Sequence, residues 1–259
     1  MERTTFTTAG PLRIVVEIEA GDIRVQTDDT ETTSVQVEAS RGAQPEVHQA
    51  EEPGGGSTIW VRSATKKRFR SDTDVAISCP HGAELDVTTG SAGVVVRGSV
   101  GALGYRAGSG DLVFERVDRD VSVKVGSGDV IGEHVGGALT MLGASGDVRV
   151  REVAGELTVK TASGDVSVGP VGGDVAITSI SGDVTVGSVR EGTVNIRSVS
   201  GDVEVGVARG TRVFLDLAAS SGDTRSDLSR SDGVGDAPRM LELHVATVSG
   251  DIRVKREGR

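Results

Sequence analysis

Residues 145–162 of this chain read SGDVRVREVAGELTVKTA. Val148 and Val150 alternate with arginines in the first half, and Leu157 and Val159 alternate with threonine and lysine in the second half. Alternation of apolar and polar side chains at every second position is typical of β-strands with one buried face. The segment therefore predicts two short strands, separated by turns that contain glycine.

The tripeptide Ser-Gly-Asp that opens this stretch recurs at an almost constant interval. It starts at Ser109, Ser127, Ser145, Ser163, Ser181, Ser200, Ser221 and Ser249, so the intervals are 18, 18, 18, 18, 19, 21 and 28 residues. A period that holds two short strands predicts a chain wound as a coil, in which each turn hydrogen-bonds to the next at about 4.8 Å. The predicted fold class is all-β, a single-stranded β-helix or β-solenoid with about 18 residues per coil.

Stacked coils place like residues in columns, and the repeats supply two aliphatic columns. One is predicted to contain Val130, Val148, Val166, Val184 and Val203, and the other Leu139, Leu157, Val175 and Val194. Each fully buried aliphatic side chain contributes about 1.5–3 kcal/mol. The chain has only four phenylalanines, one tryptophan and one tyrosine. We therefore expect the core to depend on aliphatic columns and not on aromatic packing.

Charge and composition argue against several classes of protein. Lys and Arg number 28 against 38 Asp and Glu, and the resulting net charge of −10 repels polyphosphate, so nucleic acid is not an expected partner. No stretch approaches 18 apolar residues and residues 1–6 carry no apolar leader, which predicts no membrane insertion and a cytoplasmic location. Cys79 is the only cysteine of the sequence, so no internal disulfide can form, and a small buried hydrophobe is the expected role.

The period predicts one continuous domain in two parts. Residues 1–71 contain strand-like runs without the repeat and are expected to form an irregular β segment that caps the coil, and residues 72–259 are expected to form the repeat solenoid. The prolines and glycines of residues 40–57 predict a loop with about one helical turn. An insertion at residues 229–239 delays the last repeat and predicts a surface loop.

A column of aspartates at the coil corners is the most conspicuous polar feature. The predicted structural turn ladder consists of Asp111, Asp129, Asp147, Asp165, Asp183 and Asp202, continued by Asp223 and Asp251, with Gly110, Gly128, Gly146, Gly164, Gly182 and Gly201. Glycine would supply a positive φ, and the Ser and Asp side chains would bond amides left free by the turn. Calcium is the alternative, because β-rolls with 18-residue coils bind it through G-G-x-G-x-D repeats. Here the second half of each coil mostly lacks the aspartate, so each ion would lose most of its ligands.

A carboxylate column also allows a carbohydrate-active or glycan-binding protein as an alternative. Polysaccharide-cleaving enzymes pair an acid with an ionised carboxylate inside a groove, whereas the coils between Ser91 and Ser220 are too short to build one. The histidines lie far apart without ligand spacing, at His48, His81, His134 and His244. We therefore predict that the protein is not an enzyme, and we expect no catalytic residue, cofactor or metal.

One basic cluster stands out on this acidic chain. It comprises Lys66, Lys67, Arg68 and Arg70, with Trp60 shortly before it. A hairpin edge protected from aggregation by its lysines is the first interpretation. The alternative is a docking patch for an acidic partner or an anionic lipid.

The segment DVAISCPHGAELDVTT at residues 74–89, followed by recurrent Ser-Gly-Asp-Val, resembles a bacterial "putative adhesin" β-strand-repeat family, also called toast-rack domains. The resemblance covers about residues 72–256, with a weaker echo at residues 10–37. It implies a right-handed single-stranded β-helix without known catalytic residues, in a family often linked to envelope-stress systems.

These patterns together predict a non-enzymatic structural or interaction protein, an adhesin-like β-solenoid scaffold. Its exposed strand positions alternate Arg, Lys, Thr, Ser and Glu, so recognition of a partner would be polar and spread over several coils. The expected partner is another protein or a second copy of the chain, which would stack on the end of the coil where the cap is incomplete.

Overall fold

The computed structural model describes residues 2–8, 10–40, 45–52, 55–63, 72–228 and 239–257. Every regular element in these ranges is a β-strand, and the strands wind as a β-solenoid, which confirms the predicted fold class. The chain forms two compact units, residues 1–131 (unit 1) and 132–259 (unit 2). The described part of the chain contains no helix long and apolar enough to span a membrane. The boundary after residue 71 between the irregular cap and the repeat solenoid stays a prediction.

Unit 1 contains ten strands among its described residues, and an eleventh crosses the unit boundary. They are β1 (Glu2–Thr7), β2 (Leu12–Asp28), β3 (Thr32–Ala39), β4 (Glu46–Glu52), β5 (Gly56–Arg62), β6 (Thr73–Pro80), β7 (Glu84–Val100), β8 (Ala102–Ser109), β9 (Leu112–Val117), β10 (Val121–Ser127) and the crossing strand β11 (Val130–Val135).

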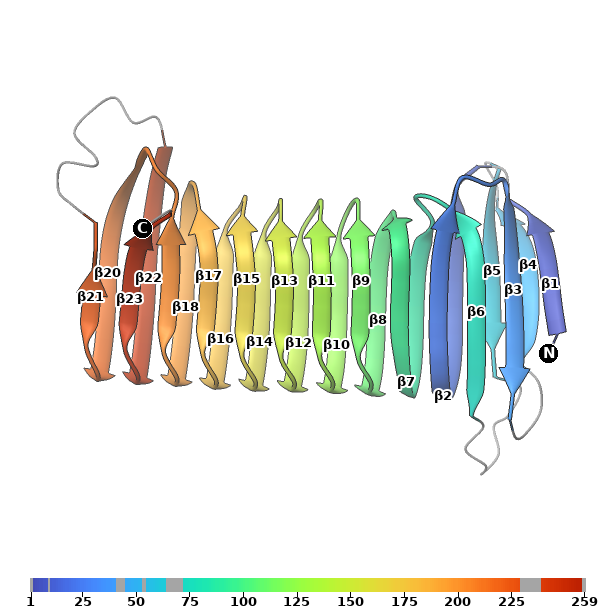
Figure 1. Cartoon of the computed structure of the whole chain (residues 1–259), viewed down its shortest axis with the longest axis horizontal. Coiled ribbons are helices and arrows are strands. Elements are labelled where there is room, and N and C mark those ends of the chain that lie inside the picture. The colour runs from blue at the N-terminus through green and yellow to red at the C-terminus, as the bar shows by residue number, and fades with distance from the viewer. Residues whose placement is uncertain are drawn as a thin grey trace. The chain divides into compact units, whose positions relative to one another are not determined.

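Two long strands organise unit 1. β2 and β7 pair in parallel along most of their length, from Arg13 opposite Glu84 to Gln26 opposite Arg97, and both take part in the two rows of strands that face each other across the core. One row runs β1, β3, β6, β2, β7, β9; β3 is antiparallel to both of its neighbours, and the other pairs of the row are parallel (Figure 1). The other runs β4, β5, β2, β7, β8, β10.

Unit 2 repeats a two-strand coil. Its strands are β12 (Leu139–Ser145), β13 (Val148–Val153), β14 (Leu157–Ser163), β15 (Val166–Val171), β16 (Val175–Ser181), β17 (Val184–Val189), β18 (Gly192–Ser200), β19 (Val203–Val207), β20 (Thr211–Ser221), β21 (Thr224–Ser226), β22 (Arg239–Ser249) and β23 (Ile252–Arg256). Even-numbered strands pair in parallel in one row and odd-numbered strands in the other. Within this unit the predicted columns are confirmed, since Val148, Val166, Val184 and Val203 lie opposite one another in successive coils.

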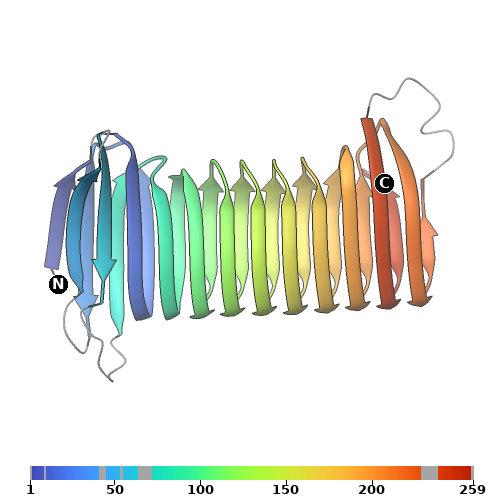
Figure 2. The same cartoon turned by 180° about the vertical axis from the view of Figure 1, so that it is seen from behind.

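The last coils of unit 2 do not stack in chain order. β22 lies between β18 and β20, and β23 lies between β19 and β21, so the coil that ends the chain occupies an inner position (Figure 2). The outermost coil is β20 with β21, which comes one repeat earlier in the sequence. After the coil that contains Ser221, the chain therefore returns to an inner position for the coil that contains Ser249, and the interval of 28 residues between these two serines spans that return.

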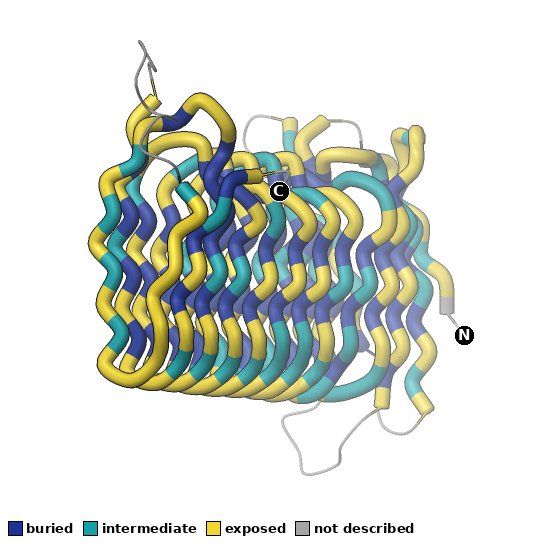
Figure 3. The backbone as a smooth tube through the Cα atoms, turned by 60° about the vertical axis from the view of Figure 1, so that its left-hand side comes forward, coloured by how far each residue is buried: buried dark blue, intermediate teal, exposed yellow. Residues whose placement is uncertain are grey.

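The core of each unit is a set of aliphatic columns between the two rows of strands. Buried and exposed residues alternate along the strands of both units (Figure 3). Leu139, Leu157, Val175 and Val194 form the second predicted column, and all are almost fully buried. The alternation predicted from the sequence thus places one face of the strands β12 to β19 in the core.

Residues 46–52 correct one expectation. They form strand β4, antiparallel to β5, in a region where a loop with a helical turn was predicted. The alternation of Val47, Gln49 and Glu51 is weak, and pairing with the apolar strand β5 is what fixes its conformation. The loop predicted at residues 229–239 lies outside the described residues except for its last residue, which belongs to β22.

Candidate interaction surfaces

The aspartate column forms a hydrogen-bonded ladder along the corners of the coils. Each carboxylate accepts the backbone N–H of the corner aspartate in the next coil through Oδ1. The N–O distances are 2.9 Å for Asp165 on Asp147, 2.9 Å for Asp183 on Asp165, and 2.8 Å for Asp202 on Asp183. The six predicted corner glycines all have positive φ. The ladder thus bonds backbone amides at turns where no strand partner is in register.

The hydrogen bonds of the ladder follow the spatial order of the last coils and not their order in the sequence. Asp251 donates its N–H to Asp202 at 2.8 Å, and Asp223 donates its N–H to Asp251 at 2.9 Å. Asp223 therefore stands at the end of the column although it precedes Asp251 in the sequence. In unit 1 the same contact joins Asp129 to Asp111 at 2.9 Å and Asp22 to Asp74 at 3.1 Å.

Asp147 is held in its ionised form. The backbone N–H of Asp165 and the Arg149 guanidinium, which lies 2.7 Å from Oδ2, lower the pKa of Asp147 below its ordinary value. A carboxyl with a lowered folded-state pKa stabilises the protein above the unfolded pKa, and this contribution is lost as the pH falls through the folded-state pKa.

Asp147→Ala should therefore destabilise unit 2 by about 1 kcal/mol at neutral pH, because Asp165 loses its acceptor. Asp147→Asn, whose amide oxygen still accepts that N–H, should cost less. The difference between wild type and the alanine variant should shrink as the pH falls below about 4, the ordinary range of the carboxyl. Urea denaturation followed by circular dichroism at pH 7 and pH 3 measures this, and a pH-independent difference would contradict the proposed role of the charge.

The hydrogen bonds of the aspartate ladder reduce the number of oxygen ligands that it could offer to calcium. One oxygen of each bonded carboxylate already accepts an amide, so it offers a reduced set of ligands to a cation. Among the described residues, no three His, Cys, Asp or Glu side chains gather closely enough to hold a metal ion. Three ladder residues, Asp183, Asp202 and Asp251, line a hollow of about 200 Å³ together with Glu204 and Arg253.

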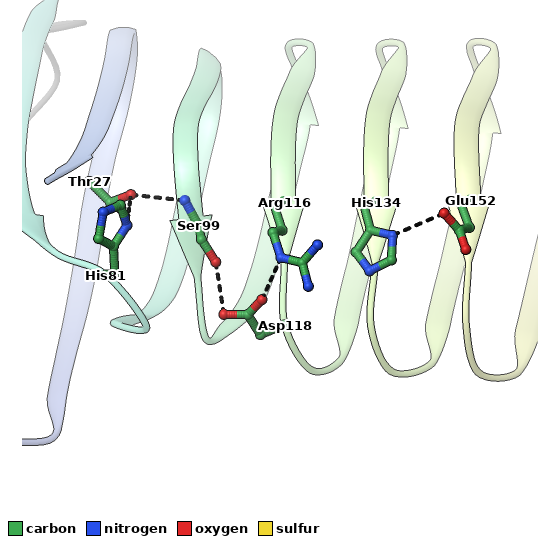
Figure 4. Close-up of polar contacts among 7 residues, drawn as sticks. All are labelled: Thr27, His81, Ser99, Arg116, Asp118, His134 and Glu152. Carbon is green, nitrogen blue, oxygen red and sulfur yellow. Dashed lines mark hydrogen bonds and ion pairs between the residues drawn. The ribbon is translucent and has the colours of Figure 1, made fainter. Parts of the chain in front are cut away.

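The histidines lie in separate places, as their spacing predicts. In unit 1, His81 Nδ1 lies 2.8 Å from Thr27 Oγ1, and that hydroxyl accepts the Ser99 N–H at 2.8 Å (Figure 4). Ser99 Oγ in turn donates to Asp118 at 2.8 Å. The serine thus contacts a carboxylate and not the imidazole, and the hydroxyl that does meet the imidazole belongs to Thr27, which is buried.

In unit 2 the histidines each face a carboxylate. His134 Nδ1 lies 3.3 Å from Glu152 Oε2, and His244 Nδ1 lies 3.3 Å from Asp216 Oδ2 (Figure 4 shows the first pair). His48 in unit 1 lies 3.3 Å from Glu46. These are exposed or half-exposed surface contacts.

Two further candidates from the sequence are the predicted docking patch, which includes Trp60, and the single cysteine, Cys79. Trp60 lies on β5 with the Arg62 guanidinium 5.9 Å from its ring centroid, a cation–π contact. Lys66, Lys67, Arg68 and Arg70 of the predicted docking patch lie outside the described residues. Cys79 is buried in β6, and burial raises the pKa of its thiol to about 12, which leaves it unreactive at neutral pH.

An apolar surface column that sequence reasoning missed lies beside the aspartate ladder in unit 2. Ile180, Val199 and Val248 occupy the same position in three adjacent coils and are 56%, 49% and 54% exposed. We call these three residues the exposed aliphatic column. The signal in the sequence was present, since each residue directly precedes the serine of a Ser-Gly-Asp repeat where other coils carry Gly, Ala or Ser.

The outermost strand of unit 2, β20, is an open edge. It pairs with β22 on one side, and no described strand pairs with its other side. Val213, Leu215 and Leu217 point to the core side, yet all three remain half-exposed because no described coil covers them. Phe214, on the outer side, is 61% exposed and its ring centroid lies 6.4 Å from that of His244. Among the described residues, this end of the core is therefore a candidate interaction surface of unit 2.

One family model covers almost the whole chain. The model of the Toastrack DUF4097 family matches residues 12–255. The chain is similar to a solved putative adhesin from Bacteroides fragilis, with 12% identity, 98% of this chain and 96% of that chain covered, and a TM-score of 0.44. It is also similar to a solved putative lipid binding protein from Parabacteroides distasonis, with 14% identity, coverage of 98% and 96%, and a TM-score of 0.37.

A putative cell adhesion protein from Clostridium sporogenes is similar at 11% identity, with coverage of 98% of this chain and 99% of that chain and a TM-score of 0.28. No curated protein matches the sequence. The family model spans nearly all of both units and includes the corner repeats described above. The chain therefore belongs to the Toastrack DUF4097 family.

Proposed function

We propose that this protein is a non-enzymatic, adhesin-like module that associates with a second copy of itself through the open edge of β20. One observation carries the proposal: among the residues that the structure describes, no coil covers Val213, Leu215 and Leu217, although the columns of Leu215 and Leu217 are buried in the inner strands β22, β18 and β16. An edge strand with unpaired backbone groups and apolar side chains is a ready partner for another strand.

The sequence of β20 is complementary to itself. If two copies of β20 pair antiparallel about a two-fold axis at Phe214, Arg212 of one copy lies opposite Asp216 of the other, and Val213 lies opposite Leu215. The two Phe214 side chains then face each other across the axis. Opposite charges and apolar pairs across antiparallel strands each stabilise the pairing by about 0.2–1 kcal/mol.

A charge swap tests this arrangement. Asp216→Arg places two like charges opposite each other twice in the dimer, so we expect the dimer to dissociate, with a dissociation constant raised about tenfold or more. Arg212→Asp combined with Asp216→Arg restores opposite charges and should restore the dimer. Sedimentation equilibrium over a range of protein concentrations measures both.

Asn195→Arg is the matched control, because Asn195 occupies the same column as Asp216 in the inner strand β18. It should leave the dissociation constant unchanged. A wild-type protein that stays monomeric at high concentration, or a double variant that fails to recover association, would overturn the proposal. Circular dichroism spectra of all variants should be the same, since every changed side chain is on the outer face.

A further inference from the structure

The outer face of unit 1 carries a groove of about 440 Å³ over β1, β3, β6, β2 and β7. The strand register places its residues in two rows across the sheet. In the first row Arg3 lies opposite Gln36, Gln36 opposite Ala76, Ala76 opposite Arg24, and Arg24 opposite Val95. Figure 1 shows β1, β3 and β6 next to one another at this end of unit 1.

The residues of the second row show why this face of the sheet is hollowed. Ser34 lies opposite Ser78, Ser78 opposite Gln26, and Gln26 opposite Arg97. Small side chains, two serines here and Ala76 in the first row, occupy the middle of the face, and longer side chains stand around them. The volume lies within the range of small-molecule sites, about 300–1,000 Å³.

The groove is positively charged although the chain carries a net charge of −10. Arg3, Arg24 and Arg97 line it, and no carboxylate is among its lining residues. The neutral polar residues that line it are two glutamines and two serines. The Ser78 hydroxyl already donates to Asp28 at 3.3 Å, and the other three offer N–H or O–H donors. The lining thus combines positive charge, hydrogen-bond donors and the apolar side chains of Ala76 and Val95.

Elsewhere in unit 1, four of the exposed arginines that the structure describes are paired with acids, and Arg106 is not. Arg13 lies 2.6 Å from Asp86, and Arg119 lies 2.6 Å from Glu84. In the groove, only Arg24 has such a partner, the exposed Asp22 on its own strand at 2.8 Å. Arg3 donates to Ser34 Oγ at 3.4 Å, and neither Arg3 nor Arg97 forms an ion pair with any residue that the structure describes. Arg3 and Arg97 are therefore available to an anionic ligand, and the pair of Arg24 with Asp22 is an exposed one of small free energy that a phosphate could replace.

We propose that this groove binds a small organic phosphate. Arg24 and Arg97 lie diagonally on neighbouring parallel strands, about 8 Å apart at Cα, so their side chains can reach one phosphate group between them. A phosphate dianion has three terminal oxygens for the forked donors of two guanidinium groups, with Gln26 beside them. The organic part would lie over Val95 and Ala76, toward Arg3. This site is separate from the β20 edge and does not depend on self-association.

Isothermal titration calorimetry of the full chain with phenyl phosphate, inorganic phosphate and phenol tests the proposal. We expect phenyl phosphate to bind with a stoichiometry of one, more tightly than inorganic phosphate, and phenol not to bind. Arg97→Gln and Arg24→Gln should each weaken the binding of phenyl phosphate about tenfold, the loss of one charge-assisted contact. Raising the salt concentration should weaken it as well.

Arg149→Gln is the matched control. Arg149 pairs with Asp147 at 2.7 Å, two residues away on the chain, as Arg24 pairs with Asp22, but it does not line the groove. It should leave the affinity unchanged. Equal losses in Arg149→Gln and Arg97→Gln, or no binding of phenyl phosphate at millimolar concentration, would overturn the site. Equal affinities for inorganic and phenyl phosphate would overturn the organic ligand.

Discussion

Replacing Gly182 with alanine should lower the free energy of unfolding of unit 2 by about 3 kcal/mol or more. Gly182 forms the corner between β16 and β17 with a φ of +122°, a conformation that L side chains rarely adopt. A Cβ at this position would also overlap the carbonyl oxygen of Gly164 in the coil below and lie 2.7 Å from its carbonyl carbon. Backbone of the neighbouring coil cannot move aside without shifting the ladder at Asp165 and Asp183.

Two further glycines separate the causes. Gly210→Ala has a φ of +75° but no atom within 4 Å of the added Cβ, so it should cost only the positive φ, about 1–2 kcal/mol. Gly169 has no positive φ, but a Cβ there would overlap the carbonyl oxygen of Arg151 and lie 3.0 Å from its carbonyl carbon. Gly169→Ala therefore measures the cost of the overlap with the neighbouring coil alone. Urea denaturation followed by far-UV circular dichroism gives all three values. A Gly182→Ala variant no less stable than Gly210→Ala would show that the coils can separate freely at the corner.

Tyr105→Ala should destabilise unit 1 by about 3–5 kcal/mol, the range for removing a large buried aromatic side chain. Tyr105 is fully buried in β8, between Val87 of β7 and Val123 of β10. The Tyr105 hydroxyl donates to the carbonyl oxygens of Ala92 and Gly110, each of which lies 3.0 Å from the hydroxyl oxygen. Tyr105→Phe keeps the ring and loses only this hydrogen bond, so it should cost about 1 kcal/mol.

Alkaline pH provides a second measurement on the same residue. Burial, and then the charge of Asp111, raise the pKa of Tyr105 to about 12 from an ordinary value of 10. A raised pKa means that the neutral phenol stabilises the fold below pH 10, and that this stability is lost as the pH rises toward 12. The loss should be absent in Tyr105→Phe. Since the chain has one tyrosine, ultraviolet absorbance of the phenolate reports it alone, and ionisation near pH 10 in the folded protein would contradict the burial argument.

The regular coils could be predicted from the sequence because each column repeats one residue type at a fixed interval. Val148, Val166 and Val184 stack as the period of 18 requires, and the corner glycines all have the positive φ that the turns demand. Local sequence is sufficient there, since pairing with the next coil at any other register would expose one apolar column to water.

The exposed aliphatic column was missed for a different reason. Ile180 and Val199 stand one residue before the corner, where alternation predicts an outward side chain, so an apolar residue there carries no signal of burial. Only the position of the neighbouring coils shows that these side chains adjoin one another on the surface.

By itself, then, the sequence determined the coil: its length, its two short strands, its aliphatic interior and its glycine corners. The tertiary structure decided the order of the last coils, where β23 brings apolar Ile252 and Val254 to the inner position and β21 places polar Thr224 at the open end. It also brought together Arg3, Arg24 and Arg97, which lie up to 94 residues apart in the chain. The physical reason is that a repeat fixes what each coil can bury, whereas the choice between competing edges depends on the total apolar surface covered when all coils are assembled.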